Sequence, residues 1–459
     1  MPVAPSKATV AIVGGGLAGL AAGCALADDG YSVQLYERRP YLGGRASSYQ
    51  HPATGEVVDN CQHVLLGCCT NLIDLYRRSG VEDKVRWFDR LHFLEPGGRG
   101  SSIEITSLPA PLHTLPSFLA SKALDLRDKI GVAQAMLKMR KEIGDDGRSF
   151  LEWLRTQGQT ERSIQRFWAP VLVSALNEDL DRCSTRYAAQ VFRESFLKSA
   201  EAGRMGIPAI PLSDLYSAAG DYIRQRGGEV NLRASIETFK SGNHGVTLCV
   251  GGREVSAEFA ILAAPFNVIG NLLPSDETTR PLRNQLAQFE SSPITGIHLW
   301  FDRQITDLEH AVLLDRTIQW IFHKSKLLNR TGDGSYIELV VSSSKSLVEL
   351  GRQEIIDLAV RELADFFPIV NRAKLTKATV IKEVHATYSP KPGVDKYRPS
   401  QTSPWPRVFL AGDWTQTNWP ATMEGAVRSG YLAAEAVAGK RFLVPDLPAT
   451  GLMKFLGGK

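Results

Sequence analysis

Residues 14–19, with the sequence GGGLAG, constrain the fold of this chain more than any other feature. The apolar run Thr9–Val13 before them predicts a buried strand, and Leu17–Asp29 after them predicts a helix that ends at Gly30. Residues 8–27 are also apolar and long enough to span a bilayer. Four glycines between residues 14 and 19 favour a strand, a tight turn and a helix in a globular fold instead.

The turn matches the GxGxxG pattern of dinucleotide-binding folds, in which each glycine has its own task. Gly14 permits the tight turn, Gly16 lets the backbone approach a pyrophosphate, and Gly19 lets the helix pack closely on the strand. The exposed N–H groups at the start of the helix, at Leu17 and Ala18, then face the phosphates. We therefore predict that these five residues bind a dinucleotide.

An acidic residue follows at the spacing that this pattern requires. Ser32–Glu37 predicts a second strand, and Glu37 ends it about 20 residues after the turn, where it can bind a ribose 2′-hydroxyl. The alternative is that Glu37 is a solvent-exposed acid at the end of the strand and has no part in binding. Arg38 and Arg39 leave NADP open as an alternative ligand, because a guanidinium can hold its extra phosphate.

A second glycine pair favours FAD over NADP. Glu37, five further residues and then Gly43-Gly44-Arg45 resemble the second fingerprint of flavoproteins in the amine oxidase and carotenoid desaturase superfamily. The two glycines let the backbone run beside the pyrophosphate, and Arg45 brings a permanent positive charge to it. We count Glu37, Arg38 and these three residues among the FAD-binding residues.

The other end of the chain carries a matching signal for the flavin ring. Residues 407–413 predict a buried strand that ends at Gly412-Asp413, and residues 422–439 predict a helix capped by Thr422. Asp413 can accept a hydrogen bond from the ribityl hydroxyls, and a helix N-terminus suits the electron-rich edge of a reduced flavin. The residues expected at this N-terminus are Met423, Glu424, Gly425, Ala426 and Val427.

The middle of the chain supplies a third piece of the cofactor domain. Residues 212–226 predict a helix, and strands are expected at 229–232, 236–239 and 257–264. In the superfamily that the motifs resemble, the residue at Ile236 contacts the adenine through its backbone. The predicted fold is α/β, a Rossmann-type FAD-binding domain interleaved with an α+β substrate domain, as in flavin amine oxidases. The FAD-binding domain is expected at 1–105, 206–290 and 400–440, and the substrate domain at 106–205 and 291–399.

Length and composition are those of a globular protein with more than one core. The chain has 459 residues, 43% of them hydrophobic and 22% charged, with a net charge of +4. So small a charge argues against a dedicated nucleic-acid partner but permits contact with an anionic membrane surface. The start MPVAPSK predicts no secretory leader, and six cysteines without a CxxC pair predict reduced thiols in the cytoplasm. Cys61, Cys68 and Cys69 near His63 match no zinc spacing, so we expect no metal.

Two further segments each have two interpretations. Residues 109–141 mix prolines and aliphatic residues with the bases Lys122, Arg127, Lys129, Lys138, Arg140 and Lys141. They predict either an amphipathic surface that lies on the inner face of the cell membrane or an ordinary surface helix. Five aromatic residues suit either an apolar pocket or the core: Trp168, Phe192, Trp300, Trp320 and Phe322.

Two longer stretches resemble a narrower family, the bacterial hydroxysqualene dehydroxylases or squalene-associated FAD-dependent desaturases. Residues 59–68, DNCQHVLLGC, are similar to that group's DNGQHVLLG segment, and residues 412–430, GDWTQTNWPATMEGAVRSG, are similar to its flavin-end signature. Cys61 and Asn418 stand where the group usually has glycine; Asn tolerates a left-handed backbone, whereas Cys61 adds bulk beside the flavin.

The resemblance implies the reductive dehydroxylation of hydroxysqualene to squalene, for hopanoid or sterol synthesis. Reduced flavin would supply the hydride, and the protein an acid, a dry pocket and shape. Asp59 and His63 are the candidates for acid or positioning roles; the alternatives are a turn cap and a structural histidine. The partners implied are a hydrophobic polyprene substrate and an unidentified electron donor for the flavin.

Three other functions remain open from the sequence. A carotenoid-type desaturase would use the flavin in the oxidising direction on a similar polyprene. An amine oxidase is less favoured, because no lysine or aromatic cage is evident over the flavin. A prenyl-binding escort protein of the same fold would have no reason to keep both halves of a flavin site.

Overall fold

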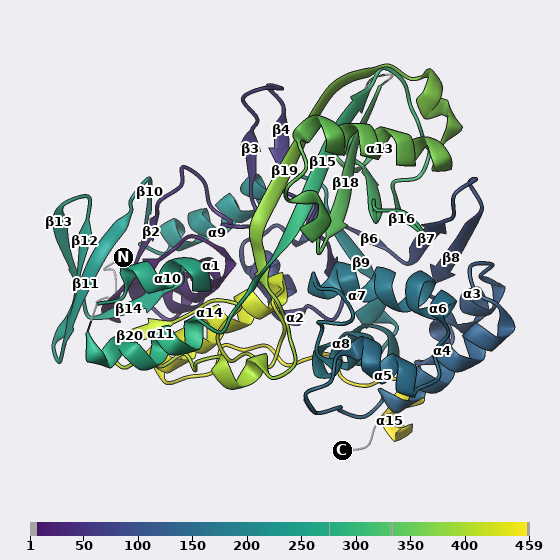
Figure 1. The fold of residues 1–459 in the computed structure, drawn as a ribbon. Helices are drawn as coiled ribbons and strands as arrows, with labels where there is room; N and C mark the ends of the chain where they lie inside the picture. The colour runs from purple at the N-terminus through teal and green to yellow at the C-terminus, as the bar shows by residue number, and fades with distance from the viewer. Residues whose placement is uncertain (1–6, 275, 331, 333, 457–459) are drawn as a thin grey trace.

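A parallel sheet joins three distant blocks of the chain. The computed structural model describes residues 7–274, 276–330, 332 and 334–456, and Figure 1 shows its ribbon. Five parallel strands lie in the order β10-β2-β1-β14-β20. Their bounds are Glu229–Leu232 (β10), Tyr31–Glu37 (β2), Lys7–Val13 (β1), Phe259–Leu262 (β14) and Val408–Leu410 (β20). The expected β–α–β unit is present, because residues 8–27 form a strand and a helix rather than one membrane span.

Helices cover the parallel sheet and bring two N-termini to one place. They are α1 (Leu17–Asp28), α2 (Thr70–Arg78), α9 (Leu212–Gln225) and α14 (Met423–Ala438). Helix α14 packs directly on α1, and a Cβ at Gly430 would lie 2.2 Å from the backbone oxygen of Ala18. Glycine is therefore required where the first turn of α1 meets the middle of α14. The first residues of both helices face the same cavity, which is described below.

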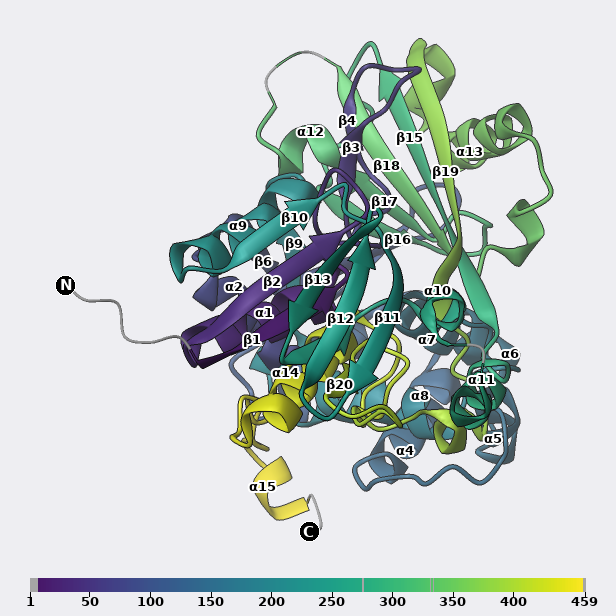
Figure 2. The same cartoon turned by 90° about the vertical axis from the view of Figure 1, so that its left-hand side faces the viewer.

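Smaller elements surround this half. A three-stranded antiparallel sheet stands at its edge (Figure 2). Its strands are β11 (Ile236–Gly242), β12 (Gly245–Val250) and β13 (Arg253–Ala257). Two further small sheets join β3 (Ser48–Gln50) with β4 (Val57–Asp59), and β5 (Leu65–Leu66) with β9 (Met205–Pro208) and β6 (Val85–Phe88). Helices α10 (Phe266–Leu272) and α11 (Arg280–Leu286) follow the parallel strand β14.

A seven-stranded sheet builds the second half, in the order β19-β15-β18-β17-β16-β7-β8. Its strands are Leu375–Tyr388 (β19), Ser291–Phe301 (β15), Ser335–Ser342 (β18), Trp320–His323 (β17), His310–Leu313 (β16), Arg90–Leu94 (β7) and Gly100–Glu104 (β8). Helices α12 (Lys324–Leu327) and α13 (Arg352–Phe366) accompany it. Strands β7 and β8 were expected in the cofactor domain, within residues 1–105. That boundary is wrong, because β7 pairs with β16 of the large sheet.

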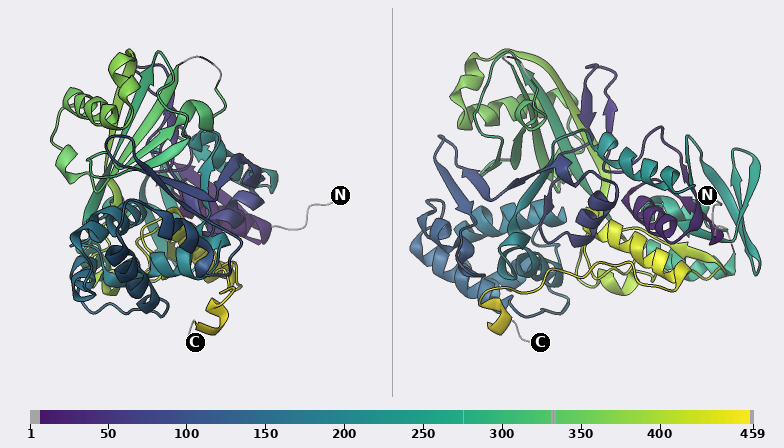
Figure 3. Two further views of the ribbon diagram at one scale, coloured as in Figure 1. Left: turned by 90° about the vertical axis from the view of Figure 1, so that its right-hand side faces the viewer. Right: turned by 180° about the vertical axis from the view of Figure 1, so that it is seen from behind.

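A block of helices lies below the large sheet (Figures 1 and 3). It consists of α3 (Leu115–Ala120), α4 (Leu126–Lys138), α5 (Phe150–Thr156), α6 (Glu161–Ser163), α7 (Ala169–Leu176) and α8 (Thr185–Phe192). Two π-helical turns, Ile164–Trp168 and Arg193–Leu197, extend it. Among the described residues, no helix is both long and apolar enough to cross a membrane.

The last segment of the chain ties the two halves together. After α14, the Val444 amide donates a hydrogen bond to the side-chain oxygen of Asn71, at 2.8 Å. The segment then reaches the helical block, where the Leu452 amide donates to the Ala110 backbone oxygen at 2.8 Å. The short helix α15 (Met453–Leu456) ends it there, below the other helices in Figure 1.

Candidate flavin and substrate cavity

One cavity of about 440 Å³ lies where the parallel sheet, the large sheet and the helical block meet. Its wall contains the loop after β1, the loop after β2, the end of β20 and the start of α14. The predicted residues that line it are Gly14, Gly16, Leu17, Ala18, Glu37, Arg38, Gly43, Gly44, Arg45, His63, Ile236, Gly412, Asp413, Met423 and Ala426. The structure therefore brings both predicted ends of the cofactor site into one space.

Two glycine loops touch each other and form a cradle for a pyrophosphate. Gly16 and Gly43 form an isolated parallel bridge, and a Cβ at Gly44 would lie 3.0 Å from the Gly16 Cα. Gly43 and Gly44 have φ angles of +101° and +63°, which glycine adopts without strain. Side chains at these positions would fill the space that a pyrophosphate needs, so the residues present fit a bound dinucleotide.

Gly14 and Gly19 allow the backbone of the turn after β1 to pack closely against its neighbours. Gly14 has a φ of +112°, and a Cβ there would lie 2.7 Å from the Ala263 backbone oxygen. A Cβ at Gly19 would lie only 1.9 Å from the Gly14 backbone oxygen. Gly19 does not line the cavity, and its task is the close packing of helix on strand.

The Glu37 carboxylate links the two glycine loops. Oε2 accepts a hydrogen bond from the Gly15 amide at 2.8 Å, and Oε1 accepts one from the Arg39 amide at 2.8 Å. Arg39 also donates to the Gly44 backbone oxygen at 2.9 Å, so it braces the cradle. Each carboxylate oxygen keeps a second lone pair, and the ribose contact of Glu37 stays a prediction.

Arg45 pairs with the acid from the opposite end of the chain. Its guanidinium donates to Asp413 Oδ1 at 2.7 Å and to the Ala386 backbone oxygen at 2.9 Å. Burial is the largest single effect and opposes the charge on Arg45, but the Asp413 carboxylate together with Glu383 raises the pKa of Arg45. The positive charge is therefore shared with Asp413 rather than free for a pyrophosphate alone, which changes the role expected for Arg45.

The start of α14 contributes less than the sequence suggested. Thr422 caps the helix by accepting a hydrogen bond from the Gly425 amide at 3.1 Å, and Thr422, Met423 and Ala426 line the cavity. Glu424, Gly425 and Val427 do not line it. The Glu424 carboxylate instead accepts hydrogen bonds from α2 and pairs with Arg428 at 2.7 Å.

A loop after β4 forms the wall next to Arg45. Asn60 donates a hydrogen bond to the Arg45 backbone oxygen, and Asn60, Cys61, Gln62 and His63 all line the cavity. Cys61, which stands at a usual glycine position of the group that the segment resembles, thus places its side chain in the cavity wall, and its nearness to the flavin stays a prediction. Burial raises the pKa of the Cys61 thiol well above its ordinary value, so this thiol is neutral.

His63 lines the cavity, and one hydrogen bond sets which of its ring nitrogens carries the proton. Its Nδ1 lies 2.8 Å from the Cys61 backbone oxygen. A carbonyl oxygen can only accept, so Nδ1 carries the proton and Nε2 keeps its lone pair. Burial lowers the pKa of His63, which keeps the ring neutral near pH 7. The structure thus favours a base at His63 over the acid that the sequence suggested.

Asp59 lies behind the cavity wall, and its expected role as an acid is not supported. It does not line the cavity, is 5% exposed and forms an ion pair of 2.7 Å with Lys324. Burial is the largest single effect and opposes its charge, but the Lys324 ammonium together with hydrogen bonds from Ser48 and the Leu212 amide lowers the pKa of Asp59. An ionised and enclosed carboxylate cannot protonate a substrate in the cavity.

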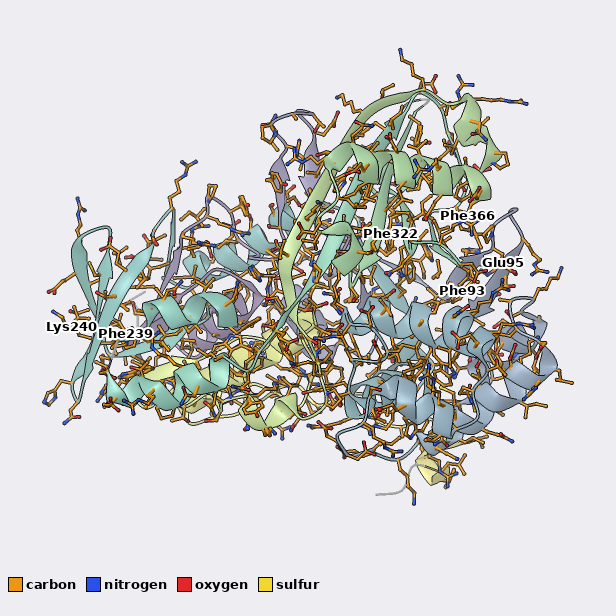
Figure 4. The ribbon with its side chains drawn as sticks, in the orientation of Figure 1. Phe93, Glu95, Phe239, Lys240, Phe322 and Phe366 are labelled. Atoms are coloured by element: carbon orange, nitrogen blue, oxygen red, sulfur yellow. The ribbon has the colours of Figure 1, made fainter. Side chains whose placement is uncertain are left out.

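The far part of the cavity is mainly apolar. Trp320 and Phe322 of β17 line it together with Val64, Ala175, Ile294 and Val340, and Figure 4 labels Phe322 beside the central strands of the large sheet. Trp168, Phe192 and Trp300 lie in the core instead. No lysine occurs among the described residues of the wall.

Several polar wall residues have no role predicted from the sequence, and Asn177 and Glu383 are two of them. Asn177, in the left-handed conformation at φ +52°, ends α7 and donates to the Ser292 backbone oxygen at 3.0 Å. An asparagine after an apolar helix run is a common C-terminal signal and could have marked this bend. Glu383, on the long strand β19, places a carboxyl in the wall. Its position depends on strand register, for which the sequence contains no local signal.

Comparisons with known proteins agree with this geometry. Residues 17–438 match the model of the family described as flavin containing amine oxidoreductase. The chain is 29% identical to 15-cis-phytoene desaturase of Synechococcus elongatus, over 94% of this chain and 96% of that protein. It is 28% identical to zeta-carotene desaturase of Synechocystis sp., over 93% and 96%.

Solved structures of low sequence identity share the fold. An oxidoreductase from Methanosarcina mazei superposes with a TM-score of 0.73 at 16% identity, over 94% of this chain and all 100% of that one. Putrescine oxidase superposes with a TM-score of 0.72 at 18% identity, over 95% and 100%. The predicted fold class is thereby confirmed.

The family match also confirms the predicted cofactor and the enzymatic class, and leaves no support for a non-catalytic escort protein. The named relatives agree better with the alternative of a carotenoid-type desaturase than with a hydroxysqualene dehydroxylase. This chain belongs to the family of flavin-containing amine oxidoreductases and is an FAD-dependent oxidoreductase.

Proposed function

We propose that this enzyme acts on a linear polyprene, a long hydrocarbon chain built from isoprene units. The observation that carries the proposal is the apolar wall of Trp320, Phe322 and Val340, which continues from the glycine cradle in one cavity. An amine substrate has less support, because the described wall combines apolar side chains with no lysine near the flavin end. A bound flavin supplies hydride transfer at N5, in either direction.

Desaturation is the direction that the relatives and His63 support. The relatives named above are desaturases of carotenoid precursors. Forming a double bond removes a hydride and a proton from neighbouring carbons, so the protein must provide a base beside the flavin. The neutral His63, with Nε2 unprotonated, has the protonation state for this task.

Reductive dehydroxylation of hydroxysqualene is the second candidate. It is supported by residues 59–68 and 412–430, which resemble the dehydroxylase segments and surround the flavin end of the cavity. This direction needs an acid that protonates the departing hydroxyl group. Glu383 is the wall carboxyl that remains for that step, since Glu37 and Asp413 hold the cofactor loops.

One assay with two arms separates the candidates. The oxidised holoenzyme is mixed with phytoene and a quinone acceptor, and the chemically reduced holoenzyme is mixed with hydroxysqualene without oxygen. Desaturation predicts a more conjugated product in the first arm, read from its absorption spectrum. Dehydroxylation predicts squalene in the second arm, read by mass spectrometry. Turnover of neither polyprene, together with oxidation of an amine, would overturn the proposal.

We also propose that the enzyme binds the membrane surface from which such a substrate must be drawn. Nine of the 13 large apolar side chains that are exposed in the described chain belong to two segments. We call them the apolar–basic surface: Leu108, Leu112, Leu119, Leu126, Ile130, Leu137, Leu452, Phe455 and Leu456. Leu126 is 69% exposed and Phe455 is 86% exposed. Contact between so many apolar side chains and water is unfavourable, so such a cluster is typical of a binding surface.

Charge and position support a lipid partner for this surface. Residues 108–141 contain six basic and two acidic residues, a net +4 that equals the net charge of the whole chain. The Leu452–Ala110 hydrogen bond joins the C-terminal part to the rest of the surface. Basic residues among exposed aliphatic side chains favour an anionic bilayer. The cytoplasmic location stays a prediction.

Vesicle sedimentation tests this part of the proposal. The wild-type holoenzyme is expected to pellet with vesicles that contain phosphatidylglycerol and less with pure phosphatidylcholine. The double variant Leu126→Ser and Ile130→Ser should lose most of this binding. Ile369→Ser with Val384→Ser is the matched control, because those side chains are 37% and 42% exposed elsewhere. Equal loss in the control, or no binding by the wild type, would contradict the proposal.

A further inference from the structure

A buried lysine lies directly behind the cavity wall and contacts one wall residue. Lys324, the first residue of α12, is 1% exposed. Its Nζ donates to Asp59 Oδ2 at 2.7 Å and to Gln62 Oε1 at 2.7 Å, and lies 3.5 Å from Glu338 Oε2. Of these four residues, Gln62 alone lines the cavity.

The lysine is charged although it is enclosed. Burial is the largest single effect and opposes its charge, but the charge interactions and hydrogen bonds with Asp59 and Glu338 together raise the pKa of Lys324. Asp59 is the ionised partner, since Lys324 in turn lowers the pKa of Asp59. Because water does not screen a buried charge, the Lys324 ammonium interacts strongly with the groups that surround it. Its nearest neutral polar contact is the Gln62 amide.

The Gln62 amide has one orientation only. Lysine nitrogen can only donate, so the Gln62 oxygen must face Lys324. On its other side Nε2 donates to the His63 backbone oxygen at 2.9 Å, and a carbonyl oxygen can only accept. The reversed amide would lose both contacts. One of the two amide protons is used by His63, so the second N–H remains for another acceptor, and Gln62 itself lines the cavity.

We propose that Lys324 is a positioning residue that holds the Gln62 amide with its free N–H toward the cavity, where it donates to a carbonyl oxygen or ring nitrogen of the bound flavin. The neighbouring Asn60 is joined to Arg45, and Arg45 pairs with Asp413 at the flavin end. A donor at an electron-rich atom stabilises the reduced, more negative ring. The inference rests on the flavin and not on the identity of the substrate.

The reduction potential of the bound flavin is the measurement that tests this role. Lys324→Met and Gln62→Leu are purified with flavin and titrated with redox dyes while the visible spectrum is followed. Each variant is expected to lower the ratio of reduced to oxidised flavin about tenfold at a fixed potential, or about 30 mV for a two-electron couple. A merely structural role would lower the melting temperature and leave the potential unchanged.

The double variant shows whether the lysine acts through the amide. If it does, Lys324→Met adds little to the shift already caused by Gln62→Leu. Additive shifts would mean that the lysine acts through its field alone, and would overturn the proposal. Lys198→Met is the matched control, because it removes another lysine from an ion pair, 2.8 Å from Glu194, outside the cavity wall. An equal shift in this control would also overturn it.

Gln62→Leu keeps the test decisive where Lys324→Met does not fold. Removing the lysine leaves the buried Asp59 carboxylate without its counter-ion, which is strongly destabilising. Gln62→Leu keeps the Lys324–Asp59 ion pair and changes the side-chain volume little. An unchanged flavin potential in Gln62→Leu alone is therefore sufficient to reject the inference.

Discussion

The Arg45 guanidinium lies 2.7 Å from Asp413 Oδ1, and these two residues are 368 positions apart in the chain. The pair joins the loop that follows the second glycine motif to the strand end that carries the flavin-end signature. Both residues line the cavity. The cofactor site is thus closed by one ion pair between the two ends of the chain.

Replacing Arg45 by methionine is expected to weaken FAD binding. The change removes a charge-assisted hydrogen bond, worth about 1.5–3 kcal/mol, and leaves the Asp413 carboxylate unpaired in the wall. The dissociation constant should rise roughly tenfold to a hundredfold, measured by calorimetry on the apoprotein. Arg77→Met is the control, because its pair with Glu82 is exposed and distant from the cavity. Equal affinity in Arg45→Met and wild type would contradict the assignment.

Gly16→Ala and Gly19→Ala should separate cofactor binding from folding. A Cβ at Gly16 meets only the Gly44 Cα, at 3.8 Å, so the apoprotein should fold while its cradle is narrowed for a pyrophosphate. A Cβ at Gly19 would lie 1.9 Å from a backbone oxygen and must distort the turn. We expect a colourless but folded Gly16→Ala and a Gly19→Ala of much lower melting temperature. A yellow Gly16→Ala with normal affinity would show that the cradle is misplaced.

The pH dependence of turnover should distinguish a base from an acid at His63. Burial lowers the pKa of His63, so the neutral form dominates above about pH 6.5. A base predicts a rate that rises with pH through this lowered pKa and stays level above it, whereas an acid predicts loss of activity over the same range. His63→Gln should reduce kcat by about 10²–10⁴-fold and abolish the rise in rate with pH. If the variant keeps the rise in rate with pH, another titrating group is responsible for that rise.

Glu338 should make the protein less stable as the pH rises from 6.5 to 8. Burial is the main cause that raises the pKa of Glu338 to about 8, above its ordinary 4.5, with Lys324 opposing. The folded state then keeps a proton that the unfolded chain has lost, so stability falls with rising pH, by at most about 1.4 kcal/mol per pH unit. Below about pH 6.5, His298 offsets this slope, because burial lowers its pKa to about 3 and its contribution to stability rises with pH.

Urea unfolding at pH 6.5 and pH 8 measures this effect. Glu338→Gln should flatten the slope, because glutamine does not titrate, while a variant of the exposed Glu277 should keep it. An unchanged slope in Glu338→Gln would mean that the carboxyl is already ionised at pH 6.5.

Much of the cofactor site was predictable because its signals are local. The φ of +112° at Gly14 and the close contact at Gly19 are properties of one turn, and short-range sterics select glycine there. The left-handed Asn418, at φ +56°, follows from the same reasoning. The boundary at residue 105 was wrong because the pairing of β7 with β16 depends on strands more than 200 residues apart.

The candidate catalytic residues show the opposite case. Asp59 and His63 are four positions apart, yet Asp59 lies behind the wall with Lys324 and His63 lies in it. Glu424 was expected at the flavin, but its carboxylate accepts a hydrogen bond from α2 and forms an ion pair with Arg428. Side-chain direction and partner are decided by packing against elements that the sequence does not place.

The sequence by itself determined the glycine turns, the strands and helices around them, the two-ended FAD site and the enzyme class, because each depends on backbone geometry within a few residues. The tertiary structure alone decided the protonation of His63, the ion pairs of Asp59 and Arg45, and the orientation of Gln62. Those properties depend on burial and on charges from distant strands, and both arise only when the two sheets and the helical block close around one cavity.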